Sequence, residues 1–118
     1  MDYFLYLSSC NTCKRIMGEL SLPKEVILID IKKEPLTEDQ LAYLYHSTGS
    51  HLDLINKRAQ LFKSRKIDPQ KLTEEAAKDL LLEHYTFLKR PVLVYRDQVY
   101  VGHSKAVVAD AKKGLDEH

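Results

Sequence analysis

Residues 3–31 pass from a strand pattern through a helix pattern to a second strand pattern. Residues 3–7 form a short, apolar, aromatic-rich run, which is typical of a buried strand. Residues 11–20 place apolar side chains on one side of a helix. Residues 25–31 are rich in β-branched side chains and predict a second buried strand. Two strands joined by one short helix predict a βαβ unit with parallel strands.

The rest of the chain predicts a helical middle and then a pair of strands. Thr37 and Gln40 form a capping box, and the helix that it opens should end at Gly49. Further helices are expected over residues 52–66 and after Thr73. Residues 91–95 and 99–101 should form a hairpin, and residues 105–113 a last helix. This order predicts one α/β domain, residues 1–118, with a mixed four-stranded sheet and a helical insertion at 36–88.

Charge and hydropathy exclude several classes of protein. The chain has 118 residues, with 18 Lys and Arg against 17 Asp and Glu, and this balance argues against direct nucleic-acid binding through phosphate neutralisation. The longest apolar run is residues 26–29, whereas a membrane span needs roughly 20 residues. The start of the chain shows no targeting pattern. We therefore expect a cytoplasmic protein without a membrane partner, and a monomer.

Cys10 and Cys13 are the only cysteines, and they lie where the first strand gives way to the first helix. Unpaired N–H groups and the helix dipole favour a thiolate at such a position. Lys14 and Arg15 add positive charge nearby. The spacing places Cys13 one helical turn behind Cys10. We therefore expect Cys10 to act as the nucleophile and Cys13 to resolve the adduct.

The cysteine pair also fits two roles without redox chemistry. A Cys-x-x-Cys pair is half of a zinc site, but a structural zinc site needs four ligands, and the five histidines are scattered. Both cysteines could instead be buried residues without chemistry. The redox interpretation is favoured because the pair follows a strand in a βαβ pattern. We expect no metal and no bound cofactor.

Arg58 and Arg90 are the second candidate group. Taken alone, each is a typical solvated surface charge, and residues 51–71 hold six basic against two acidic side chains. The functional alternative is an oxyanion site, because guanidinium groups match tetrahedral oxyanions with paired hydrogen bonds.

Taken in order, the motifs resemble the arsenate reductase family of thioredoxin-like proteins, which also includes the Spx-type regulators. The segments that carry the resemblance are residues 5–10, 30–37, 56–62, 89–94 and 101–102. The resemblance implies a thioredoxin-like fold with a helical insertion. It also implies that Cys10 is the nucleophile that attacks arsenate, that Arg58 and Arg90 hold the oxyanion, and that Pro91 is the cis-proline of this fold.

Three positions depart from the reductase pattern. His103 stands where the reductases carry a third arginine, and Tyr6 stands where they commonly carry a histidine. Cys13 is absent from many reductases but present in Spx-type regulators. Each of the three departures weakens arsenate as the substrate, and Cys13 favours disulfide chemistry within the chain.

Two functions therefore follow from the resemblance. The favoured one is an arsenate reductase-like thiol oxidoreductase that uses glutathione, glutaredoxin or thioredoxin as external reductant. The alternative is an Spx-type redox-switched transcription regulator that binds the α subunit of RNA polymerase, with Cys10 and Cys13 as the switch.

Overall fold

The computed structural model describes residues 2–117, and these fall into two compact units. The first unit combines the chain up to Glu34 with the chain from Arg90 onward, and the second is Pro35–Lys89. Within residues 2–117, no helix is both long enough and apolar enough to cross a membrane.

A four-stranded mixed sheet forms the first unit, in the order β2-β1-β3-β4. The strands are β1 (Tyr3–Tyr6), β2 (Ile27–Asp30), β3 (Val92–Tyr95) and β4 (Gln98–Val101). β1 runs parallel to β2 and antiparallel to β3, and β3 and β4 form an antiparallel pair. The predicted fold class, a mixed four-stranded sheet in the order β-α-β, helices, β-β-α, is confirmed.

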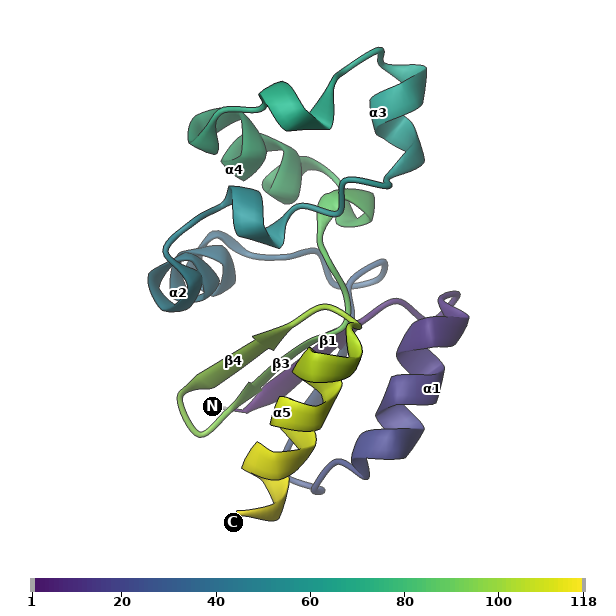
Figure 1. Cartoon of the computed structure of the whole chain (residues 1–118), viewed down its shortest axis with the longest axis vertical. Coiled ribbons are helices and arrows are strands. Elements are labelled where there is room, and N and C mark those ends of the chain that lie inside the picture. Colours follow the sequence, from purple (N-terminus) through teal and green to yellow (C-terminus); the bar gives the residue numbers. More distant parts are fainter. Residues whose placement is uncertain (1, 118) are drawn as a thin grey trace. The chain divides into compact units, whose positions relative to one another are not determined.

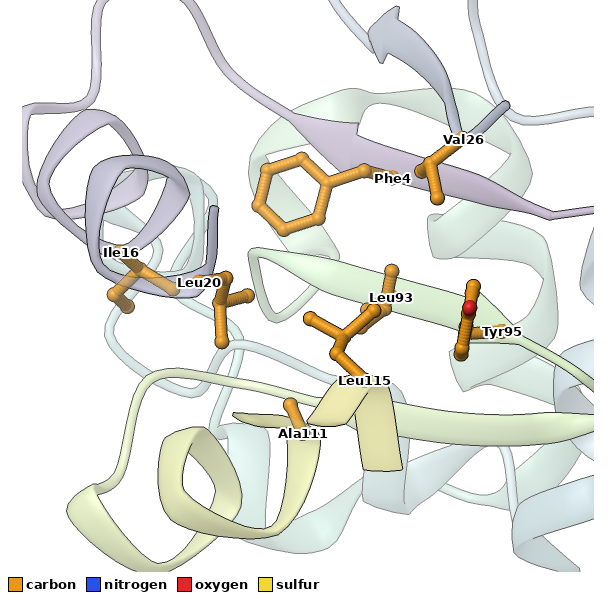
Figure 2. Packing of buried hydrophobic residues seen from close by; sticks show 8 residues of the cluster. All are labelled: Phe4, Ile16, Leu20, Val26, Leu93, Tyr95, Ala111 and Leu115. Carbon is orange, nitrogen blue, oxygen red and sulfur yellow. The ribbon is translucent and has the colours of Figure 1, made fainter. Parts of the chain in front are cut away.

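Two helices, α1 (Asn11–Leu20) and α5 (Lys105–Asp116), run alongside this sheet (Figure 1). Figure 2 shows Phe4 of β1 and Leu93 of β3 among the apolar side chains of both helices, with Ile16 on α1 and Ala111 on α5. Phe4 is fully buried, and Ile16 is 1% exposed. This packing fixes α1 against β1, so the turn between them is held at both ends.

The expectation that the second strand is buried is wrong. Ile27 and Leu28 are 45% and 50% exposed. β2 lies at the edge of the sheet and pairs only with β1, so its other side has no neighbouring strand.

The second unit is helical. Its elements are α2 (Glu38–Thr48), η1 (Leu52–Leu54), α3 (Gln60–Ser64), η2 (Pro69–Lys71), α4 (Glu74–Glu83) and η3 (Tyr85–Phe87). The predicted capping box is present, because the Thr37 hydroxyl accepts from the Gln40 N–H and the Gln40 side chain accepts from the Thr37 N–H. Gly49 ends α2 with φ at 79°, and Thr73 caps α4.

The single helix expected over residues 52–66 is wrong. The chain forms the short helix η1, leaves helical geometry at Ile55, and resumes as α3. Ile55 instead forms an antiparallel bridge with Leu88. Pairing with a distant segment therefore competes with the local helical pattern and interrupts it.

Candidate functional site

Cys10 is the N-cap residue of α1. Its backbone is extended, with φ at −94° and ψ at 111°, and its N–H donates to the Leu7 carbonyl at 2.9 Å. The Lys14 N–H donates to the Cys10 carbonyl at 3.2 Å as the helix begins. The thiol therefore lies where the first N–H groups of the helix lack partners within the helix.

Opposing effects set the pKa of the Cys10 thiol. Partial burial alone raises the pKa, but hydrogen bonds from the Cys13 backbone N–H and from the Cys13 thiol lower it. The charge of Arg90 and the N–H of Thr12 lower it further. The balance leaves the pKa of Cys10 below its ordinary value. Cys10 is half-buried, so its sulfur combines thiolate character with access to a reagent.

Cys13 has the opposite character. It is fully buried, and this burial raises the pKa of its thiol to about 11. The hydrogen bond to Cys10 and the negative charge of Cys10 also raise the pKa, against a lowering backbone hydrogen bond from Leu7 and the charge of Arg90. Both cysteines are free thiols. Cys10 therefore ionises at a lower pH than Cys13, and Cys13 keeps its proton and donates it to the Cys10 sulfur.

Arg90 supplies the positive charge that acts on both thiols. It directly precedes Pro91, and the peptide bond between them is cis, as the resemblance implied. Pro91 is buried, and its carbonyl accepts from the Gly102 N–H at 2.9 Å. The structure thus brings together three of the four expected site residues: Cys10, Cys13 and Arg90.

Arg58 belongs to the second unit. It is exposed and lies between η1 and α3, and its N–H donates to Asn56 Oδ1 at 3.2 Å. The convergence of Arg58 on Cys10 stays a prediction. His103 is exposed in the turn before α5, and Tyr6 stacks against Phe4 with ring centroids 6.2 Å apart.

Asp30 is a neighbour of the cysteine turn to which the sequence analysis assigned no role at the site. It is only 8% exposed, and its Oδ1 accepts from the Lys32 N–H at 3.1 Å and from the Ser8 N–H at 3.5 Å. A hydrogen bond from the Ser8 side chain is the main cause that holds the pKa of Asp30 below its usual value. The sequence offered one signal for this role: Asp30 is an acidic residue at the carboxyl end of a strand, and that strand pairs with the one that leads to the Cys10 turn.

Metal binding finds no support among the described residues. Across residues 2–117, no three side chains of the His, Cys, Asp and Glu types lie together as a metal site would require. The residues that the structure brings together here are two thiols at the start of a helix and one guanidinium group.

Comparison with known proteins places the chain in a family. The model of the ArsC family matches residues 5–111. The chain belongs to the ArsC family. This confirms the resemblance stated from the sequence motifs.

Relatives of two kinds are similar to this ArsC-family chain. The regulatory protein MgsR of Bacillus subtilis is 24% identical over 117 residues, covering 98% of this chain and 93% of MgsR. The global transcriptional regulator Spx of Streptococcus agalactiae is 27% identical over 105 residues, covering 86% of this chain and 76% of Spx. The solved structure of an arsenate reductase from Vibrio cholerae matches with a TM-score of 0.72 at 16% identity, covering 98% and 95% of the two chains. The thioredoxin-like fold of the ArsC family is therefore shared.

Proposed function

We propose that this ArsC-family protein is a thiol oxidoreductase of the arsenate reductase type. The observation that carries the proposal is the opposite tuning of the two thiols, with the pKa of Cys10 lowered and that of Cys13 raised to about 11. A reactive thiolate next to a protonated, buried thiol is the arrangement that a nucleophile and a resolving cysteine need.

The reaction takes two steps on the protein. The Cys10 thiolate attacks the arsenic of arsenate, a sulfur–arsenic bond forms, and hydroxide leaves as water after protonation. Cys13 then loses its proton and attacks the Cys10 sulfur. A disulfide forms, the sulfur–arsenic bond breaks, and its electron pair stays on arsenic, which is released as arsenite. Two thiolates have supplied two electrons, and an external thiol such as glutathione, glutaredoxin or thioredoxin then reduces the disulfide.

Arg90 and Arg58 bind the oxyanion in this proposal. The charge of Arg90 acts on Cys10, so the same guanidinium group can stabilise the negative charge of an arsenate brought to that sulfur. Arg58 supplies a second guanidinium group. His103 stands where the reductases carry a third arginine, so this chain lacks a third guanidinium group at that position.

A second function is favoured by a specific observation. The relatives MgsR and Spx are regulators, and this chain has Cys13 beside Cys10, as Spx-type proteins do. In this alternative the same disulfide is a switch, and the partner is the α subunit of RNA polymerase.

Two assays on one preparation separate these functions. Arsenate reduction is followed with glutathione and glutaredoxin, or with thioredoxin, as donor. The reductase is supported by arsenite production that Cys10→Ser abolishes. Binding of the polymerase α subunit is measured with the reduced and the oxidised protein. Redox-dependent binding without any arsenite would replace the reductase with the regulator.

A further inference from the structure

Two short segments of the second unit pair next to Arg58. The Lys89 N–H donates to the Leu54 carbonyl at 2.8 Å, and the Asn56 N–H donates to the Phe87 carbonyl at 2.7 Å. Between these two bonds, Ile55 and Leu88 form an antiparallel bridge. Residues 54–56 are therefore fixed to residues 87–89 within the second unit.

Apolar side chains shield this pairing from water. Leu54, Ile55 and Phe87 are fully buried, and Leu88 is 1% exposed. Hydrogen bonds between such buried segments are costly to break without replacement. The pairing therefore holds in place the residues that directly follow each of the two segments.

The side chain of Asn56 extends this pairing to Arg58. Its Oδ1 accepts from the Arg58 N–H at 3.2 Å, and its Nδ2 donates to the Thr86 carbonyl at 3.3 Å. One amide thus holds the backbone of Arg58 and the backbone of the segment that precedes Arg90. The position needs a donor and an acceptor on one short side chain, which Asn provides.

We propose that Asn56 is a positioning residue: by holding the backbone of Arg58 to the backbone of Thr86 in the same unit, it fixes the point from which the Arg58 guanidinium group binds the oxyanion. This inference rests on the proposed function, because the position of Arg58 matters only if Arg58 binds the oxyanion. Asn56 does not touch the anion. It acts through the backbone from which the Arg58 side chain extends.

Sulfate is a suitable probe, because it is a tetrahedral oxyanion that Cys10 does not reduce. Bound sulfate should protect Cys10 from iodoacetamide, and the concentration dependence of the protection gives a dissociation constant at fixed ionic strength. Asn56→Ala should weaken sulfate binding about tenfold, because the Arg58 backbone loses its anchor. The rate of Cys10 alkylation without sulfate should not change, since Asn56 has no part in the pKa of Cys10.

Asn56→Ser is the conservative variant, because its hydroxyl can still accept from the N–H two residues on. It should lose less affinity than Asn56→Ala. Thr73→Ala is the matched control: it removes a side-chain to backbone hydrogen bond in the same unit, at the start of α4, and should leave sulfate affinity unchanged.

A double-mutant cycle with Arg58→Ala decides whether Asn56 acts through Arg58. In the Arg58→Ala background, Asn56→Ala should cause no further loss of affinity. A full additional loss, or equal affinity in Asn56→Ala and Thr73→Ala, would overturn the inference while the oxyanion site stands. Unchanged affinity in Arg58→Ala would instead refute the role of Arg58 in the proposed function, and the inference with it.

Discussion

Alkylation at neutral pH should distinguish the two cysteines sharply. With a pKa of about 11, the Cys13 thiolate is present in about one molecule in 10⁴ at pH 7. A thiol at the ordinary value of 9.0 is ionised in about one molecule in 100. Because the thiolate is the reacting form, Cys13 should react about 100-fold more slowly than an ordinary cysteine, even before its burial excludes the reagent. Cys10, whose pKa is lowered, should react faster than an ordinary cysteine.

Single variants assign these rates to their causes. The Cys10→Ser variant keeps only Cys13 and should hardly react with the alkylating reagent. Burial is the largest cause of the raised pKa of Cys13, and the substitution leaves that burial in place. Cys13→Ser keeps a hydroxyl that can donate to the Cys10 thiolate, whereas Cys13→Ala removes the donor. Cys10 should therefore react more slowly at pH 6 in Cys13→Ala than in Cys13→Ser.

The assay is the rate of iodoacetamide labelling from pH 5 to 10 under metal-free reducing conditions, with each site identified by mass spectrometry. Labelling in concentrated urea is the control, where both sites should react at similar rates. If Cys13 of the folded protein is labelled within tenfold of the rate of Cys10 at pH 7, the assignment of the two roles is refuted.

Three further predictions concern the first unit. Mild oxidation should give a monomer lighter by two hydrogens, with Cys10 joined to Cys13, because the two thiols already contact each other; a majority of intermolecular dimers in mass spectrometry would contradict this. Gly18→Ala should raise the free energy of unfolding by roughly 0.5–1 kcal/mol, because the added methyl group meets open space on α1. Gly114→Ala should lower it, because the methyl group would collide with a tyrosine hydroxyl of β4, and urea denaturation of both variants checks the opposite signs. Since the pKa of Asp30 is lowered by folding, its stabilisation is present above the pKa of the unfolded chain and is lost as pH falls through the folded value. The stability difference between wild type and Asp30→Asn should therefore shrink between pH 7 and pH 3, and a constant difference would argue against this linkage.

Local patterns in the sequence predicted the features that depend on neighbouring residues. The Cys10 turn, the Thr37 capping box and the Thr73 cap all rest on hydrogen bonds within about one helical turn, so short motifs determine them. The helix start at Cys10 in turn supplies the Cys13 and Thr12 N–H groups, which lower the pKa of the Cys10 thiol.

Features that depend on distant contacts could not be predicted in this way. The helical pattern of residues 52–66 is interrupted because Ile55 bridges to Leu88. β2 has the composition of a buried strand, yet its exposure follows from its place in the strand order. The bond from Ser8 to Asp30 crosses 22 residues. The charge of Arg90 on Cys10 also depends on a distant contact, and here the family resemblance, not the local pattern, pointed to the residue.

The buried position of Cys13 bears on the choice between enzyme and switch. An external thiol should attack the Cys10 sulfur of the disulfide, because Cys10 is the more accessible of the two. Cys13 is then the leaving group, and a thiol with a pKa of about 11 leaves slowly.

Reduction of the Cys10–Cys13 disulfide by glutathione should therefore be slower, on the order of tenfold, than reduction of an exposed disulfide between ordinary thiols. Stopped-flow reduction, with oxidised glutathione as the reference disulfide, measures the ratio directly. If reduction is slow, the disulfide persists after it has formed, which suits a regulator. An enzyme with such a slow step would need a dithiol protein such as glutaredoxin or thioredoxin as donor. Reduction as fast as the reference would show that Cys13 gains a proton as it leaves, and the kinetic argument for a switch would fail.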